Sequence, residues 1–223
     1  MELELYCIRH GETVADQEGI VLGRSDLPLS PRGERQAREL GRYLRRLTII
    51  PTLIYTSPLR RARRFAELIA RQMPDPPPVE ECELLKEIDM GSLTGTDRRL
   101  ALGRGPGHRP LSSLLNFKPY GGEDYFDLRR RAREFFRLLV RRHLEEQETL
   151  FPVGPIFAVG HSGMLTQILS ERTCYPRPRL VFFKLDHAEV VKLVLERRYG
   201  RVIARPALQF DLEFLRHALR RGE

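Results

Sequence analysis

Two histidines in this chain of 223 residues each follow a short apolar run and stand next to a glycine. His10 follows the run 3–8, and His161 follows the run 156–159. A single histidine after a strand is more often structural than functional. Two at equivalent strand ends are typical of a site, because ligands of α/β sheets lie beyond the carboxyl ends of the strands. Imidazole can act as a nucleophile or exchange a proton near neutral pH.

Arginine side chains accompany these histidines. Arg9 precedes His10, and Arg60 and Arg61 stand near the start of an expected helix that follows another strand. A guanidinium group binds phosphate oxygens in bidentate fashion, and a helix start offers N–H groups and the positive end of the dipole. Most arginines of this helix nevertheless have the pattern of a solvated face. These residue types together indicate a site for an anion.

A carboxylic acid is the third candidate group. Glu87 lies in the segment 85–91, at the start of a glycine-rich excursion. Spacing alone does not choose Glu87 over Asp89 or Glu83.

The elements that must position these residues alternate between strand and helix. The first expected elements are a strand at 3–8, a helix from Ser30–Pro31 to about 47, a strand at 52–56, a helix from Ser57–Pro58 to about 72, and a short stretch at 82–85. Both Ser-Pro pairs give the pattern of an N-cap followed by proline at the first helical position.

The second half continues the alternation. The expected elements are a helix at 123–144, a strand at 156–159, a helix to about 171, strands at 180–185, 189–196 and 202–207 with a turn at Tyr199–Gly200, and a helix at 211–220. The inner face of helix 123–144 is expected to hold Phe126, Ala132, Phe135, Phe136 and Leu139. This order predicts an α/β fold, a three-layer sandwich with a mostly parallel central sheet and helices on both faces.

The segment 91–122 has weak periodicity and is rich in Gly, Pro, Ser and Arg, with a helical turn expected at 111–115. Long excursions of this kind are uncommon in compact domains and are often functional. We therefore expect a single domain over residues 1–223, in which this excursion forms part of the substrate pocket.

The charge and the cysteines narrow the class of protein. The net charge is +8, and only four of the 38 basic residues Lys and Arg are lysine. Such a chain attracts anionic metabolites or nucleic acid. The three cysteines lie far apart and show neither a disulfide framework nor a zinc spacing, and no run approaches membrane-spanning length. A reduced, cytoplasmic protein without a metal site or membrane partner is expected.

Six segments carry a more specific pattern. They are Arg9–Thr13, Asp26–Gly33 with Gln36–Ala37, Ser57–Ala62, Leu85–Gly91, Gly121–Glu123 with Asp127 and Arg131, and Val159–Gly163. In this order they resemble the signature of the histidine phosphatase superfamily, in its phosphoglycerate mutase-like branch. The resemblance covers residues 3 to about 170.

The resemblance implies a mechanism and selects residues for it. His10 is expected to attack phosphorus and become phosphohistidine, while Arg9, Arg61 and His161 hold the non-bridging oxygens. Glu87 is expected to protonate the leaving group and then to take a proton from water. Further substrate contacts are expected from Thr13, Gly11, Gly23, Arg24 and Ser162. The scheme requires no cofactor.

Three positions depart from the family pattern. Asp16 stands where asparagine is frequent, Ser92–Gly95 replaces a tryptophan-bearing segment, and Asp124 stands where serine is usual. A carboxylate at position 16 would repel a phosphate dianion unless an arginine such as Arg24 pairs with it.

The favoured function is a phosphomonoester hydrolase that acts through phosphohistidine on a small anionic phosphorylated metabolite. A phosphoglycerate-type mutase is the alternative, although its basic and aromatic segments have no match between Asp97 and Tyr120. A basic module that binds RNA without turnover is a remote third reading, so nucleic acid is not expected as a partner. The sequence leaves open the particular phosphomonoester and the oligomeric state.

Overall fold

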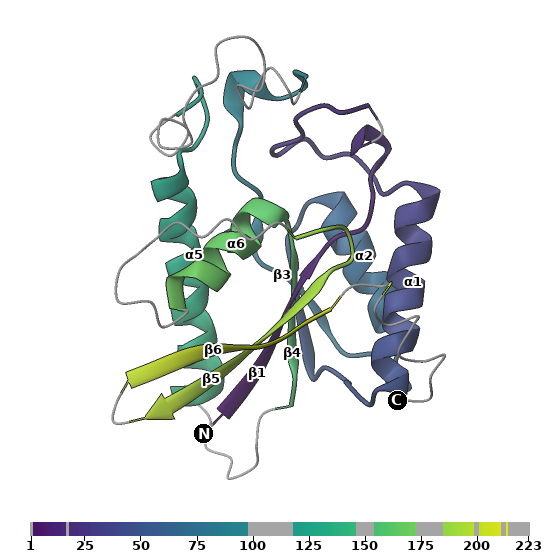
Figure 1. Cartoon of the computed structure of the whole chain (residues 1–223), viewed down its shortest axis with the longest axis vertical. Coiled ribbons are helices and arrows are strands. Elements are labelled where there is room, and N and C mark those ends of the chain that lie inside the picture. Colours follow the sequence, from purple (N-terminus) through teal and green to yellow (C-terminus); the bar gives the residue numbers. More distant parts are fainter. Residues whose placement is uncertain are drawn as a thin grey trace.

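The computed structural model describes residues 2–16, 18–97, 118–145, 154–172, 185–198, 201–210 and 213. Among them, six strands form one sheet in the order β3-β2-β4-β1-β5-β6 (Figure 1). The strands are β1 (Glu2–Arg9), β2 (Leu53–Thr56), β3 (Val79–Glu81), β4 (Ile156–Gly160), β5 (Val190–Arg198) and β6 (Arg201–Phe210). β5 and β6 confirm the strands expected at 189–196 and 202–207.

Helices cover both faces of this sheet. They are α1 (Pro31–Arg46), α2 (Arg60–Ala70), α5 (Tyr125–Val140) and α6 (Ser162–Arg172). Side chains of β1 alternate between the faces. Leu5 and Cys7 belong to the buried cluster with α5 and α6, whereas Tyr6 and Ile8 pack with α1 and α2. The expected three-layer α/β sandwich is confirmed.

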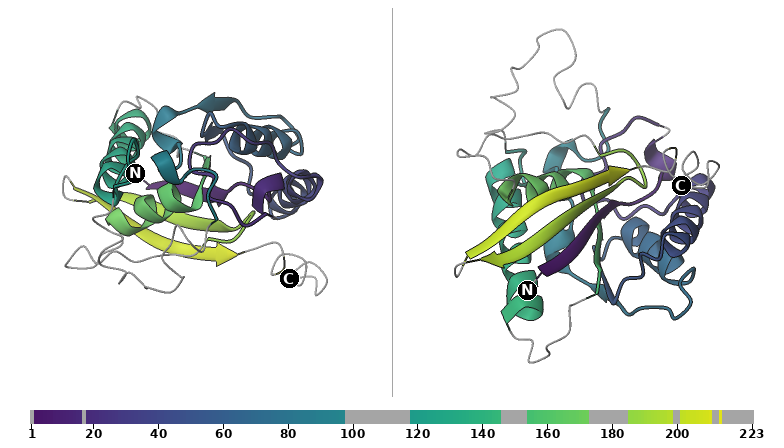
Figure 2. Two further views of the ribbon diagram at one scale, coloured as in Figure 1. Left: turned by 90° about the horizontal axis from the view of Figure 1, so that it is seen from above. Right: turned by 60° about the horizontal axis from the view of Figure 1, so that its bottom comes forward.

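The pairing of the strands decides which chain ends meet. β3, β2, β4 and β1 run parallel, whereas β5 is antiparallel to β1 and β6 is antiparallel to β5. Figure 2 shows the long β5–β6 pair lying beside β1. Because β5 runs the other way, its start lies at the same edge as the carboxyl ends of β1 and β4. Residues just before β5 can therefore reach the histidines.

Two of the expected helix starts behave differently. Ser30 caps α1 as predicted, because its side chain accepts a hydrogen bond from the Gly33 N–H (3.1 Å). The prediction for Ser57 is wrong: α2 begins at Arg60, and its N-cap is Leu59. Ser57 instead places its Oγ 2.8 Å from Nε2 of His161. The Ser57 hydroxyl also accepts from the Leu59 N–H (3.3 Å), so the signal predicted the turn but not the helix start or the contact with His161.

Asp124 explains one departure from the family pattern. It caps α5 by accepting from the Asp127 N–H (2.8 Å), and the Asp127 side chain accepts in turn from the Asp124 N–H. Aspartate and serine are both strong N-cap residues, so this exchange preserves the helix start.

The expected inner face of α5 needs one correction. Phe126 is 57% exposed, and Leu128 is fully buried instead. Position 128 falls in helical register with Ala132, Phe135 and Leu139, whereas position 126 lies on the other side. A single π-helical turn (Arg141–Glu145) follows α5, so the α-helix ends earlier than expected.

The two ends of the excursion meet at the N-terminal end of α5. The Ser92 N–H donates to the Tyr120 carbonyl (3.0 Å), and the Glu123 N–H donates to the Asp89 carbonyl (2.8 Å). The stretch expected at 82–85 follows β3 as a 3-10 turn (Glu83–Leu85). The helical turn expected at 111–115, the strand at 180–185 apart from Leu185, the turn at Tyr199–Gly200 and the C-terminal helix apart from Glu213 lie outside the described residues.

Candidate active site

The ends of β1 and β4 bring the two histidines together. Arg9 pairs with Gly160 in the parallel register, so the next residues, His10 and His161, lie beside each other. The His10 N–H donates to the Gly160 carbonyl (3.0 Å). The two imidazole centroids are 5.0 Å apart, and both side chains are buried.

The hydrogen bonds of His10 define its tautomer. Nδ1 lies 2.7 Å from the Gly11 carbonyl oxygen, which can only accept, so Nδ1 carries the hydrogen. Nε2 therefore presents a lone pair, and it accepts from Nε of Arg61 (3.3 Å). An imidazole held in this way has one nucleophilic nitrogen, with an arginine beside it.

Arg61 is the largest fully buried side chain described. Its Nη1 and Nη2 donate to the carbonyls of Ser25 (2.5 Å) and Gly23 (2.9 Å). These bonds use three of the five guanidinium hydrogens when the bond to His10 is included, so the group is oriented by the main chain and retains donors for an anion. Gly23 therefore contributes through its carbonyl.

His161 has one nitrogen bound and one without a partner. Its Nε2 lies 2.8 Å from the Ser57 hydroxyl, and its buried Nδ1 has no hydrogen-bond partner in the described part of the chain. A buried polar atom without a partner costs about 1–3 kcal/mol. Such an atom beside a nucleophile is typical of a ligand position.

Both histidines are held in the neutral form. Burial, together with the nearby guanidinium groups of Arg61 and Arg9, holds the pKa of His10 well below its ordinary value. Burial and the charge of Arg61 do the same to the pKa of His161. Desolvation disfavours the charged imidazolium, and adjacent cations add to that effect. His10 can therefore act as a nucleophile at neutral pH.

The segment before β5 holds Arg9. Nη1 of Arg9 donates to the Leu185 carbonyl (2.5 Å), and Nη2 lies 2.9 Å from Nε2 of His187. The His187 ring centroid is 5.8 Å from that of His10. A third histidine thus joins the site.

Asp16 lies in the same group, on a 3-10 turn (Val14–Asp16). Its Oδ2 accepts from the N–H (2.9 Å) and the hydroxyl (2.6 Å) of Thr13 and lies 3.2 Å from Nε2 of His187. Burial would raise the pKa of Asp16, but the hydrogen bonds from His187 and Thr13 outweigh it and hold the pKa below its ordinary value. Asp16 is therefore a carboxylate, and the Thr13 hydroxyl expected to contact substrate donates to it.

Arg24 does not pair with Asp16, contrary to the suggestion from the sequence. Its guanidinium binds Glu123 (2.8 Å) and lies 3.5 Å from Asp89. Glu123 also takes two hydrogen bonds from Arg131 (2.7 and 2.9 Å). Nε of Arg24 (3.3 Å) and Nη2 of Arg131 (3.1 Å) both donate to the Glu87 carbonyl. Arg24 thus helps to hold the main chain of Glu87.

Glu87 is the carboxylic acid that reaches the histidine end of β4. One oxygen accepts from the N–H groups of Ile88 (2.9 Å) and Met164 (3.2 Å), and the other accepts from Gly163 (3.1 Å). A Cβ at position 163 would lie 2.4 Å from Oε1 of Glu87, so any residue larger than glycine there would displace the Glu87 carboxylate. The start of α6, at Ser162, therefore places Glu87 near Arg61, with whose charge it interacts.

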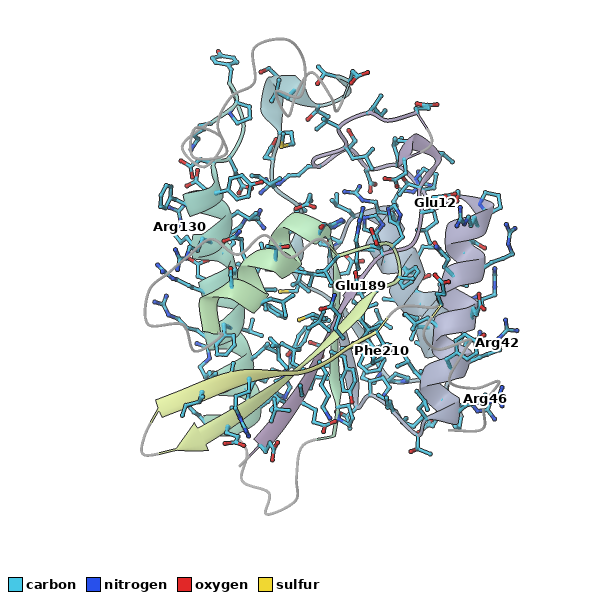
Figure 3. The ribbon with its side chains drawn as sticks, in the orientation of Figure 1. Glu12, Arg42, Arg46, Arg130, Glu189 and Phe210 are labelled. Carbon is cyan, nitrogen blue, oxygen red and sulfur yellow. The ribbon has the colours of Figure 1, made fainter. Side chains whose placement is uncertain are left out.

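Glu12 and Gly11 have structural roles. Glu12 accepts from the Ser30 hydroxyl (2.8 Å) and pairs with Arg32, and Figure 3 shows it beside the N-terminal end of α1. A Cβ at Gly11 would lie 2.7 Å from the Gly33 carbonyl oxygen, so the loop after His10 packs directly on α1. Glu12 is thus held away from the nucleophile, as the choice of Glu87 from the family resemblance implies.

Sequence reasoning missed His187 altogether. The signal that could have found it is its position two residues before Glu189, where a strand was expected to start. An antiparallel strand begins at the edge where its parallel neighbours end. The described residues contain no group of three or more His, Cys, Asp or Glu side chains arranged to hold a metal ion.

The two histidines and two arginines thus lie at the carboxyl ends of the parallel strands of a three-layer α/β sandwich, which is where such sheets bind ligands. The sequence matches the family described as histidine phosphatase superfamily (branch 1) over residues 5–205. The chain belongs to this family.

Curated relatives carry two different activity names. One similar protein is an uncharacterized phosphatase, PhoE, of Bacillus subtilis, 41% identical over 40% of this chain and 44% of its own length. Another is a probable phosphoglycerate mutase, GpmB, of Klebsiella pneumoniae, 44% identical over 41% of this chain and 40% of its own length. The matched part thus spans about two fifths of these relatives.

A solved structure shares the fold over nearly the whole chain. It is a mycobacterial glucosyl-3-phosphoglycerate phosphatase in complex with VO3, with a TM-score of 0.79 and 24% identity. The match covers 94% of this chain and 99% of that one. At this identity the likeness establishes the fold. No helix in the described part of this chain is long and apolar enough to cross a membrane.

Proposed function

We propose that this chain is a phosphomonoester hydrolase that acts through a phosphohistidine intermediate on a small anionic phosphorylated metabolite. The observation that carries the proposal is the state of His10. Its Nδ1–H is tethered to the Gly11 carbonyl, and its lowered pKa keeps Nε2 unprotonated beside Arg61. A neutral imidazole of fixed orientation is what nucleophilic attack on phosphorus requires.

In the first half-reaction, Nε2 of His10 attacks phosphorus while the bond from phosphorus to the leaving oxygen breaks. Arg9, Arg61 and His161 bind the non-bridging oxygens, and the unpartnered Nδ1 of His161 supports its part in this role. Electrostatic stabilisation by oriented donors is the main contribution to phosphoryl transfer.

Glu87 is the proposed proton carrier. It enters protonated and gives its proton to the leaving alkoxide. In the second half-reaction it takes a proton from the attacking water, and the bond between Nε2 and phosphorus breaks to release phosphate and His10. The support for this role is the placement of Glu87 at the start of α6 by three backbone N–H groups.

A mutase shares the first half-reaction and returns the phosphoryl group to a bound acceptor. The similarity to a probable phosphoglycerate mutase favours this second candidate. The two readings separate in one measurement. The phosphoenzyme of a phosphohydrolase loses its phosphoryl group to water at a rate that accounts for turnover, whereas that of a mutase resists water and passes the phosphoryl group to a phosphoglycerate acceptor.

The direct test is to trap the phosphoenzyme. Wild-type protein is mixed with a radiolabelled phosphomonoester and quenched in alkaline detergent, which preserves phosphohistidine. We expect label on His10 in the wild type and none in His10→Ala. The control variant Lys192→Ala, on β5, should be labelled as the wild type is. Turnover by wild-type enzyme without any labelled protein would contradict the covalent route.

The same proposal includes a phosphorylated small molecule as the partner and the cytoplasm as the location. The support for a reducing compartment is that Cys7 and Cys82 are buried free thiols, and burial raises the pKa of Cys7 to about 12. A single domain in which the excursion at 91–122 borders the pocket is also part of the proposal.

A further inference from the structure

Three side chains meet beside His10 in an arrangement that the proposed mechanism does not use in full. Nε2 of His187 lies 2.9 Å from Nη2 of Arg9 and 3.2 Å from Oδ2 of Asp16. One ring nitrogen cannot both accept from Arg9 and donate to Asp16, because it carries either a hydrogen or a lone pair. Nε2 of His187 can therefore form a hydrogen bond with only one of these two partners, Arg9 or Asp16.

Asp16 decides the contact. It is ionised, so it has no hydrogen of its own, and its contact with His187 is a bond only if Nε2 carries the hydrogen. A hydrogen bond to a carboxylate is charge-assisted and stronger than a neutral one. Arg9 has a second acceptor in the Leu185 carbonyl (2.5 Å). His187 thus donates through Nε2 to Asp16 and lies against Arg9.

The other nitrogen of His187 remains available. Nδ1 has no hydrogen-bond partner in the described residues, and the side chain is 23% exposed. The groups that face this ring are Arg9 and His10 from β1 and Asp16 from the turn after it, while the neighbouring Glu189 carboxylate is bound to the Asp186 N–H and to Gln209. For Nδ1 to donate to an anion bound at Arg9 while Nε2 donates to Asp16, both ring nitrogens have to carry a hydrogen.

The backbone holds this ring in place at some cost. Ala188, the next residue, is buried and has a φ of 62°, a conformation that side chains other than glycine rarely adopt. Its N–H donates to the Arg9 carbonyl (3.1 Å), and the Arg9 N–H donates to the Glu189 carbonyl (3.1 Å). Strained residues persist where the surrounding structure over-determines them, which occurs most often at functional sites.

We propose that His187 is a further phosphate-binding residue of this site and that Asp16 is the positioning residue that orients it. The proposal rests on the proposed function, in which Arg9 and His10 receive a phosphoryl group. His187 donates through Nδ1 to a non-bridging oxygen while Asp16 holds Nε2. In the same arrangement the charge of His187 offsets the Asp16 carboxylate, which would otherwise repel the phosphate.

This assignment makes an unusual prediction about pairs of substitutions. His187→Ala removes a donor and also takes the His187 contact away from the Asp16 carboxylate, which then faces the anion with the hydrogen bonds from Thr13. Asp16→Asn in the same protein removes that repulsion. The double variant should therefore bind phosphate better than His187→Ala, although it lacks two polar groups of the site.

The test is calorimetric binding of inorganic phosphate to the full chain, together with hydrolysis of p-nitrophenyl phosphate. We expect the dissociation constant to rise at least about tenfold in His187→Ala, and the double variant to recover at least about threefold of that loss. Lys192→Ala, on the strand β5 that follows His187 but outside the site, is expected to bind as the wild type does. His187→Gln should fall between His187→Ala and the wild type, because its amide reaches Asp16 but cannot carry charge. If circular dichroism shows that His187→Ala does not fold, His187→Gln replaces it in the test.

Several outcomes overturn the assignment. Binding by His187→Ala and His187→Gln equal to that of the wild type removes His187 from the phosphate site, even if His10→Ala shows that the proposed hydrolase is real. Losses that simply add in the double variant remove the charge relation with Asp16. If wild-type protein neither binds phosphate nor hydrolyses a phosphomonoester, the proposed function fails, and this assignment fails with it.

Discussion

The two sides of His10 are built from different kinds of partner. The Arg61 side consists of Arg61, His161 and Ser57, and the Asp16 side consists of Arg9, Thr13, Asp16 and His187. On the Arg61 side the side chains bind neutral groups, namely the carbonyls of Gly23 and Ser25 and one hydroxyl. On the Asp16 side a carboxylate accepts from Thr13 and contacts His187.

This difference in partners affects the net charge on each side of His10. Main-chain carbonyls orient a guanidinium without cancelling its charge, so the Arg61 side stays positive over the whole physiological pH range. The Asp16 carboxylate offsets positive charge on its own side, so the net charge there is less positive than on the Arg61 side. We infer that the Arg61 side provides most of the oxygen binding and that the Asp16 side adjusts it.

The largest effect is expected from the Arg61 side. Arg61→Ala should lower kcat/KM by about 100- to 1,000-fold, because it removes a buried donor aligned with the nucleophile. Arg61→Lys should show most of the same loss, since an ammonium lacks the planar guanidinium fork that directs donors to the Ser25 and Gly23 carbonyls and to His10 at once. Steady-state hydrolysis of p-nitrophenyl phosphate measures both.

The matched control is Arg63→Ala, two residues further along α2. Arg63 is half exposed and pairs with Glu81 and Glu67 at the surface, so its loss should change kcat/KM by less than about twofold. A comparable loss in both variants would show that general positive charge, and not the buried Arg61, supports activity.

Glu87 is expected to give the next largest effect, and a selective one. Glu87→Gln should lower hydrolysis of alkyl phosphates by about 100-fold while changing p-nitrophenyl phosphate by less than about threefold, because a good leaving group needs little protonation. Gly163→Ala should show the same selectivity, since its Cβ would lie 2.4 Å from Oε1 of Glu87. Equal losses on both kinds of substrate would contradict the proton-carrying role of Glu87.

The histidines allow a test of charge on the Arg61 side by pH. Because their pKa values are lowered, His10 and His161 should stay neutral where an ordinary histidine, near 6.5, takes up a proton. Nuclear magnetic resonance signals of their ring protons, assigned with His10→Gln and His161→Gln, should not shift between about pH 8 and pH 6. A full titration near pH 6.5 would contradict the neutral nucleophile.

The same shifts have a consequence for stability. The unfolded chain binds protons at these histidines as the pH falls below 6.5, whereas the folded chain does not, so the free energy of unfolding should decrease on acidification. Each such histidine contributes a slope of up to about 1.4 kcal/mol per pH unit. His143, whose pKa burial lowers to about 4, lies outside the site and should contribute to the same slope. Denaturant unfolding at several pH values measures the slope, and His143→Gln should reduce it without changing the ring signals of His10.

The smallest effect is expected from the support of the loop after His10. Ser30→Ala should lower the free energy of unfolding by about 1 kcal/mol, because it removes the cap of α1 and the hydroxyl that holds Glu12. Ser92→Ala is the control, because Ser92 is exposed and its hydroxyl makes no hydrogen bond with the residues that the structure describes. If Ser30→Ala also changed kcat/KM by more than about tenfold, the loop between the two sides would be a functional part of the site and not only a support.

Much of the scaffold could be predicted from local patterns. The apolar runs at 3–8 and 156–159, the Ser30–Pro31 start of α1 and the α/β alternation all follow from periodicity and capping, which depend on neighbours in sequence. The errors have the same origin. Ser57 has a cap-like sequence but bonds to His161, which lies 104 residues away along the chain. Phe126 is apolar, yet the direction of the core from α5 leaves it exposed.

The candidate site divides in the same way. Arg61 and Glu87 were selected by resemblance to a family, because spacing alone left Arg60, Asp89 and Glu83 as alternatives. The sequence suggested that Arg24 could pair with Asp16, but Arg24 binds Glu123 instead. Ion pairs between residues far apart in the sequence cannot be predicted from the sequence alone, since each arginine could pair with several acidic residues.

The sequence by itself determined the order of the elements, the strand ends that carry His10 and His161, and the excess of arginine. The tertiary structure alone decided which arginine is buried: Arg61 lies fully inside, whereas Arg42 and Arg46 lie on the outer side of α1 (Figure 3). It also decided that an antiparallel β5 brings His187 to Asp16, because strand direction depends on pairing across the sheet. Periodicity reports which face of an element is buried, but only packing between distant elements fixes which polar groups meet.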